Sequence, residues 1–130
     1  MGAQTEAVPY EEIVAQLEPD EKVALVTCNT CVRVCETGGE AFMEEMARRL
    51  RADGFEVTDE VVTITTCNRD YVFDAPMSGR QTATIVLACD VGWMAVVQRF
   101  RDRKCVKACK TTGLMSSVPK SRPKAGAAAS

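Results

Sequence analysis

The chain of 130 residues contains no histidine, few aromatic residues and no long hydrophobic run. Without histidine there is no imidazole for general acid–base catalysis, no histidine ligand for zinc, and no usual base for a lone catalytic cysteine. No apolar run approaches the ~20 residues that span a bilayer, so we predict no membrane insertion. The stretch 1–12 has neither the charged nor the apolar part of a signal peptide. We therefore expect a cytoplasmic protein.

The chain also lacks a strong excess of either charge. Its 16 basic and 18 acidic residues leave a net charge of −2, which gives no general attraction to nucleic acid. The segment 118–130 is the exception, because Lys120, Arg122 and Lys124 stand there without any acidic residue. Its proline, alanine, glycine and serine content is typical of disorder. The sequence thus predicts one metal-binding α/β domain over 1–117 and a disordered basic tail over 118–130.

Cysteine, by contrast, is abundant, with seven residues in the chain. In a cytoplasmic protein this number favours metal or redox chemistry over disulfides, and an odd count fits poorly with complete pairing. The first three form the run Cys28-x2-Cys31-x3-Cys35 directly after an apolar segment. Such a loop directs several thiolates at one soft metal centre. For Cys89 or Cys105 taken singly, a small buried apolar side chain is the alternative interpretation.

Apolar patterning predicts three helices and three strands. The helices are expected over 9–17, 40–52 and 91–103, and the strands over 22–27, 55–65 and 82–88. The stretch 68–81 contains turn signals, and no helix or strand is predicted for 104–115. Strands that alternate with helices favour an α/β fold with a small, open, mostly parallel sheet flanked by helices.

Several cysteines follow the predicted strands. Cys28, Cys67 and Cys89 each stand within two residues of a predicted strand end. Because open parallel sheets bind ligands beyond the carboxyl ends of their strands, we expect these three thiols on one rim of the sheet. Cys31 and Cys35 would lie in the loop beside them.

An iron–sulfur cluster fits this arrangement. A [4Fe–4S] cluster takes four thiolates, often three from a close-spaced loop and one from a distant segment. Cys28, Cys31, Cys35 and Cys67 meet that pattern, and a partition with Cys89 as the distant ligand stays open. The remaining residues would form or assist a second site: Cys89, Cys105 and Cys109.

Two other functions for the thiols remain open at this point. A structural zinc ion could be held by the pairs Cys28-x2-Cys31 and Cys105-x3-Cys109, which would make the protein a structural or assembly subunit. Cys28 and Cys31 could instead form a redox-active dithiol, as in thiol–disulfide oxidoreductases.

The segment 26–40 resembles a known cysteine loop. Its pattern, Cys-x2-Cys-x3-Cys-x2-Gly-Gly-Glu, is similar to that of the MetV-type small iron–sulfur subunit of bacterial methylenetetrahydrofolate reductases, the methylenetetrahydrofolate reductase C-terminal-region family. An isolated cysteine and an Ala-Cys-x-x-Gly segment in that family match Cys67 and 88–92, and 110–113 is loosely similar to its end. The resemblance covers about 9–114, whereas Cys105 and Cys109 lie outside the family pattern.

The resemblance implies a non-catalytic subunit of an oxidoreductase complex. Such a subunit relays electrons, through metal centres bound by these cysteines, to or from a flavoprotein reductase subunit that reduces methylenetetrahydrofolate. It also implies heterodisulfide-reductase-like subunits upstream of this relay as possible further partners.

Overall fold

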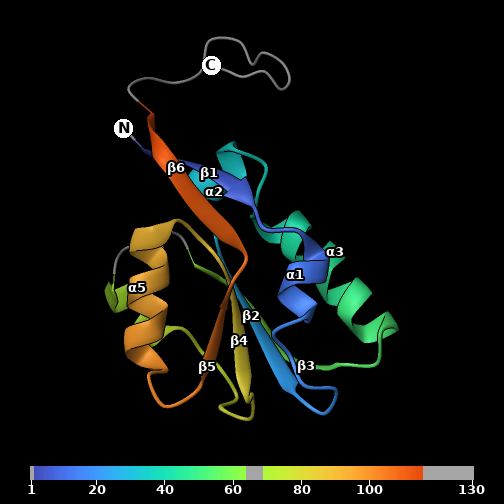
Figure 1. The fold of residues 1–130 in the computed structure, drawn as a ribbon. Helices are drawn as coiled ribbons and strands as arrows, with labels where there is room; N and C mark the ends of the chain where they lie inside the picture. The colour runs from blue at the N-terminus through green and yellow to red at the C-terminus, as the bar shows by residue number, and fades with distance from the viewer. Residues whose placement is uncertain (1, 64–68, 116–130) are drawn as a thin grey trace.

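The computed structural model describes residues 2–63 and 69–115, and it has the α/β architecture that the sequence predicts. A four-stranded parallel sheet has the strand order β3-β2-β4-β5, and β1 pairs with β6 in a separate antiparallel ribbon (Figure 1). The strands are β1 (Gly2–Ala7), β2 (Lys22–Cys28), β3 (Glu56–Thr63), β4 (Ala83–Leu87), β5 (Lys104–Lys107) and β6 (Cys109–Met115).

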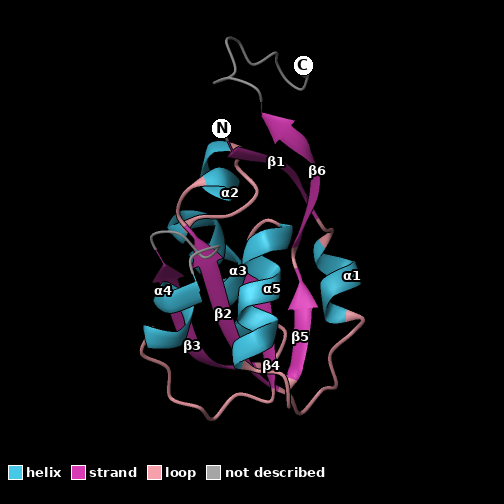
Figure 2. Ribbon diagram, turned by 90° about the vertical axis from the view of Figure 1, so that its left-hand side faces the viewer, coloured by secondary structure: helices cyan, strands magenta, loops and turns pink. Residues whose placement is uncertain are grey.

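Helices cover both faces of the parallel sheet. They are α1 (Tyr10–Val14), α2 (Cys31–Val34), α3 (Glu40–Ala52), α4 (Arg69–Asp74) and α5 (Asp90–Arg99). Helices α1 and α3 lie on one face, and α4 and α5 lie on the other (Figures 1 and 2). The short helix α2 lies beside the β1–β6 ribbon at the carboxyl end of the sheet. No helix within the described ranges is long and apolar enough to cross a membrane.

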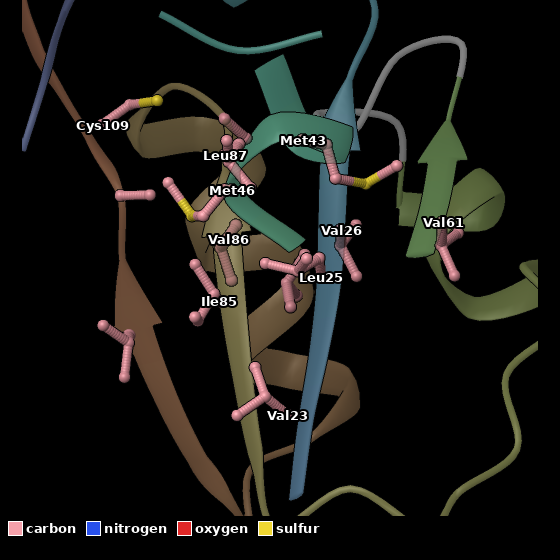
Figure 3. Packing of buried hydrophobic residues seen from close by; sticks show 14 of the residues in the cluster. Val23, Leu25, Val26, Met43, Met46, Val61, Ile85, Val86, Leu87 and Cys109 are labelled. Carbon is pink, nitrogen blue, oxygen red and sulfur yellow. The ribbon is translucent and has the colours of Figure 1, made fainter. Parts of the chain in front are cut away.

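The two central strands form the core because both of their faces are covered. After Lys22, every residue of β2 is buried, and so is every residue of β4. These are the continuous apolar runs expected of strands with helices on each side. On one face, Met43 and Met46 of α3 pack over β2 and β4, as Figure 3 shows.

Helix α3 has the bounds that the sequence predicts. Its buried side chains repeat at the helical period: Met43, Met46, Ala47 and Leu50. The helix ends at Gly54, where a φ of 95° reverses the chain and the N–H of Phe55 donates to the carbonyl of Leu50. Glycine adopts this left-handed conformation without the strain that a side chain would add.

Five elements lie outside the predicted set, and one of them is the short helix α2 in the cysteine loop. The segment 104–115, for which no regular structure was expected, forms β5 and β6, and the N-terminal residues form β1. The stretch 68–81 contains helix α4. These strands carry few apolar residues, since β5 reads Lys-Cys-Val-Lys and β1 and β6 are rich in alanine, threonine and glycine. Their hydrogen-bond partners are distant in sequence, so local patterning gives little signal for them.

The order of the strands places a topological switch point at the carboxyl end of the sheet. The chain runs from β2 to its neighbour β3 and then crosses to β4 on the other side of β2. The loops that follow β2 and β4 therefore leave in opposite directions, and the space between them is the topological switch point at which α/β sheets bind ligands.

Candidate metal centre

Five of the seven cysteines lie at the carboxyl end of the parallel strands. Cys28 is the last residue of β2, Cys31 is the first of α2, and Cys35 follows α2 directly. Cys89 stands between β4 and α5, and Cys109 begins β6 two residues after β5 ends. Cys67, the expected distant ligand, lies outside the described residues.

Cys105 does not reach this edge. It lies in β5 opposite Thr84, the second residue of β4, and therefore near the amino ends of the parallel strands. Four residues of extended chain separate it from Cys109, a distance of about 13 Å. The two cysteines belong to different strands, so the structure does not form the compact Cys105–Cys109 pair that the zinc interpretation needs.

Strand β1 holds the thiols of α2. The N–H of Ala3 donates to the Sγ of Cys31 at 3.3 Å, and the Cys35 thiol donates to the carbonyl of Ala3 at 3.8 Å. Cys31 and Cys35 are four residues apart and share one face of the helical turn. Both backbone groups of Ala3 thus point toward the sulfurs rather than toward β6.

Cys109 is fully buried at the start of β6. Its thiol donates to the carbonyl of Thr37 at 3.1 Å, and it lies at the end of the buried cluster in Figure 3. Burial raises its pKa to about 12; electrostatic repulsion from Cys35 and Cys89 acts in the same direction, while hydrogen bonds with Thr37 and the Ala88 backbone oppose it.

Asp90 and Thr111, which stand near Cys89 and Cys109 in the sequence, form two hydrogen bonds that we call the clamp. The N–H of Asp90 donates to the hydroxyl of Thr111 at 2.8 Å, and the N–H of Thr111 donates to the Asp90 carboxylate at 3.4 Å. Lys107 pairs with the same carboxylate at 2.8 Å, and its hydrogen bond lowers the pKa of Asp90. The clamp ties the start of α5, which follows Cys89, to β6, in which Thr111 stands two residues after Cys109.

Cys28 has a different environment. The hydroxyl of Thr27, the preceding residue, accepts a hydrogen bond from the N–H of Gly39 at 2.8 Å, so Thr27 points toward the face that α3 covers. Successive side chains of a strand point to opposite faces, so Cys28 is directed toward the face of α4 and α5. Its sulfur lies 2.7 Å from the hydroxyl of Thr30, and only 5 % of the residue is exposed.

The turn after α2 is packed too tightly for a side chain at Gly38. The N–H groups of Thr37 and Gly38 donate to the carbonyl of Val32 at 2.8 and 3.1 Å. A Cβ atom on Gly38 would lie 2.6 Å from a methyl group of Val32, which is itself fully buried. The glycine that the sequence associates with helix entry therefore also allows the loop to close over Val32.

The described thiols do not form a closed site for a single ion. Among residues 2–63 and 69–115, no group of three or more cysteine or acidic side chains is arranged to hold one metal ion. A four-iron cluster spaces its thiolates more widely, because each cysteine binds a different iron atom.

Sequence reasoning identified the cysteines but missed the groups that position them. Ala3 and Thr37 contact the sulfurs through backbone atoms, and Asp90 and Thr111 form the clamp. Backbone N–H and carbonyl groups are common to nearly all residues, so the sequence does not indicate which of them contact the sulfurs. Thr111 stood only in a predicted turn, and its pairing with Asp90 depends on strands that the sequence did not reveal.

The chain was compared with protein-family models, curated proteins and solved structures. None of them matches it.

Proposed function

We propose that this protein is a non-catalytic iron–sulfur subunit that relays electrons to or from a flavoprotein partner, of the methylenetetrahydrofolate reductase type. The observation that carries the proposal is the gathering of five thiols, from the loops that follow β2, β4 and β5, at the carboxyl end of the sheet. Thiolates are the ligands of iron–sulfur clusters, and this edge is where α/β sheets bind ligands.

The surroundings of the thiols support the same function. Cysteine thiolates need N–H donors when they carry negative charge, and the Ala3 N–H already donates to Cys31. The Ala88 backbone lowers the pKa of Cys109 in the same manner. Hydrogen bonds to cluster sulfurs raise the reduction potential, since they stabilise the more negative reduced state.

Access from outside is the second requirement of a relay. Cys31, Cys35 and Cys89 are each partly exposed, whereas Cys109 is buried. A centre bound here would lie close to the surface, where a partner protein can exchange electrons with it. A bound cluster would supply one-electron chemistry, and the chain would hold, shield and tune it.

The similarity of the cysteine loop to MetV-type subunits suggests the kind of complex. In such complexes the partner flavoprotein reduces methylenetetrahydrofolate, and heterodisulfide-reductase-like subunits can deliver the electrons. The proposed partners of this chain are accordingly a flavoprotein reductase subunit and, upstream, subunits of that second kind.

Metal analysis of protein purified without oxygen tests the proposal. We expect about four iron and four acid-labile sulfide per chain, with a broad visible band that bleaches on reduction. Cys35→Ser should remove most of the iron and sulfide. Cys105→Ser is the matched control, because its thiol lies at the other end of β5, and it should keep the content of the wild-type protein.

Two results would replace this proposal with another. Zinc without sulfide would indicate a structural or assembly subunit that carries no electrons. Metal-free protein with thiol–disulfide exchange activity, lost on replacing Cys28 or Cys31 alone, would indicate an oxidoreductase of the dithiol type.

A further inference from the structure

We propose that the cavity between α3 and the connection from β1 to α1 binds a small apolar molecule that carries one carboxylate group. The cavity measures about 330 Å³. None of the described residues that line it is a cysteine, so the site is separate from the thiols and goes beyond the proposed function.

Two segments that are far apart in the chain form the walls of the cavity. Phe42, Met46 and Arg49 follow one another on α3 at spacings of four and three, so they share one face of the helix. The opposite wall is the connection that includes Val8 and Pro9. Figure 1 shows α1, which this connection enters, on the same side of the parallel sheet as α3.

Three contacts hold these walls in place. The N–H of Val8 donates to the carbonyl of Ala108 at 2.8 Å, which fixes the connection after β1. The hydroxyl of Tyr10 donates to the carboxylate of Asp53, the residue that follows α3, at 2.6 Å. The guanidinium carbon of Arg49 lies 3.9 Å from the centroid of the Tyr10 ring. The cavity is therefore already formed by the protein's own contacts, as small-molecule sites usually are.

Arg49 is the polar group that a ligand in this cavity can reach. None of the carboxylates in the described part of the chain forms an ion pair with it. The hydroxyl of Tyr10 is already engaged, because burial and its hydrogen bond to Asp53 raise the pKa of Tyr10 to about 12 and keep it donating to that carboxylate. The N–H groups at the edge of the Arg49 guanidinium can therefore bind an anion.

The lining sets the chemical class of this ligand. Most of the wall consists of aliphatic and aromatic side chains, which favours an apolar body, and the volume lies near the lower end of the range for ligand sites. A single guanidinium matches one carboxylate, to which it can donate two parallel hydrogen bonds. Glu45 also lines the cavity, but Arg48 pairs with its carboxylate.

Isothermal titration calorimetry on the full-length chain tests the proposal with two acids, phenylbutyrate and octanoate. Phenylbutyramide is the neutral counterpart of the first acid, with nearly the same shape. We expect saturable binding of both acids. The amide should bind at least about tenfold more weakly, since a hydrogen bond to a charged group contributes more than one between neutral groups.

Variants of the charged residues show which cation holds the carboxylate. We expect Arg49→Gln to weaken binding of phenylbutyrate about tenfold and to remove the difference between the acid and the amide. Arg48→Gln is the matched control, because Arg48 is the exposed neighbour that does not line the cavity, and it should change the affinity by at most about threefold. Glu45→Gln removes a like charge and should strengthen the binding of both acids.

Variants that fill the cavity locate the apolar part of the ligand. Ala7 lines the cavity and is exposed, so Ala7→Phe should block the binding of both acids while the chain stays folded. Gln4→Phe is the matched control, because Gln4 is an exposed residue of the same strand outside the cavity, and it should bind like the wild-type protein. Circular dichroism confirms that each variant is folded.

The results either support this site or overturn it. Loss of binding in both Arg49→Gln and Ala7→Phe would support it. Failure of the folded wild-type protein to bind either acid, or equal affinities for phenylbutyrate and its amide, would overturn it. A wild-type dimer that becomes monomeric in Ala7→Phe would assign the cavity to a second copy of the chain and overturn it too. None of these readouts depends on iron or sulfide, so failure here leaves the proposed function standing.

Discussion

The backbone of Ala3 makes hydrogen bonds with the sulfurs of two cysteines, Cys31 and Cys35. Its N–H and its carbonyl both face the sulfurs of α2, so neither takes part in the ladder between β1 and β6. A substitution that removes the N–H can therefore change the sulfur environment while the strand pairing is kept.

We predict that Ala3→Pro lowers the reduction potential of the bound cluster. Proline has no N–H, so Cys31 would lose a donor that stabilises the reduced, more negative state. The measurement is a redox titration followed by the visible or paramagnetic signal. Ala3→Gly is the control, because it retains the N–H and should keep the wild-type potential. An unchanged potential in an Ala3→Pro protein with full iron content would contradict the prediction.

At the scale of elements, the turn between α2 and α3 determines how the cysteine loop meets the sheet. The loop closes over Val32 through two hydrogen bonds to its carbonyl, and Gly38 lies directly against the Val32 side chain. Thr27 receives the N–H of Gly39 at the same place, so the turn is joined to β2 as well. Packing density at this turn is thus part of what orients the thiols.

We predict that Gly38→Ala destabilises the protein by about 1–3 kcal/mol, because the new methyl group overlaps the buried Val32 side chain. Val32→Ala removes the overlapping methyl groups, so the double variant should lose less stability than the sum of the single losses. Urea denaturation measures each free energy of unfolding.

Gly113→Ala serves as the control for this series. A Cβ atom on Gly113 meets no other atom within 4 Å, so the change should alter stability by no more than about 0.5 kcal/mol. Additive losses in the Gly38–Val32 pair would show that the close contact has no energetic consequence.

At the scale of the whole molecule, acidic side chains join segments that are far apart in the chain. Glu21 pairs with Lys104 of β5, and Asp90 pairs with Lys107. Hydrogen bonds from Lys104 and Thr82 hold the pKa of Glu21 below its usual value. Burial alone would raise the pKa of Asp59, yet hydrogen bonds from Ser78 and Thr58 lower it overall.

These lowered pKa values predict loss of stability in acid. A carboxyl group with a lower pKa in the folded state stabilises the fold above its unfolded pKa, and this stabilisation disappears as the pH falls through the folded pKa. For Glu21 the decline should begin below about 4.5, its value without the fold.

We predict that Glu21→Gln costs about 1 kcal/mol of stability at pH 7, since Lys104 and Thr82 lose a charged acceptor. The difference from the wild-type protein should shrink as the pH falls below 4.5, where the carboxyl group of the wild-type chain also becomes neutral. Urea denaturation at pH 7 and at about pH 3 measures it. Glu44→Gln, on the exposed side of α3, is the control and should differ little at either pH. A pH-independent loss in Glu21→Gln would contradict this assignment.

Much of the fold could be predicted from the sequence, because the patterns that indicate it are local. The strands 22–28 and 83–87 are continuous apolar runs, and α3 repeats its apolar residues at the helical period, so each pattern reports its own burial. The prediction of an open, mostly parallel α/β sheet is confirmed. Strands β1, β5 and β6 escaped prediction because their stability comes from distant partners, as between Gln4 and Thr112.

For the candidate site too, the sequence predicts the position of some cysteines and not of others. Placing Cys28 and Cys89 at the carboxyl ends of strands required only the strand ends, which the sequence marks. Cys109 follows the same rule after β5, yet without β5 the sequence groups it with Cys89 and Cys105 in a second site. Four residues of extended chain, about 13 Å, would have separated Cys105 from Cys109, had these strands been recognised.

The sequence by itself determined the α/β class, the length of α3 and the positions of Cys28 and Cys89 at strand ends, because apolar periodicity and residue order are local properties. Only the tertiary structure decided where in the fold each thiol lies. That depends on the face to which each side chain points and on pairing between segments about a hundred residues apart, such as β1 with β6. Cys28 is consequently directed toward the face of α4 and α5, while Cys31 and Cys35 contact the backbone of Ala3 in β1.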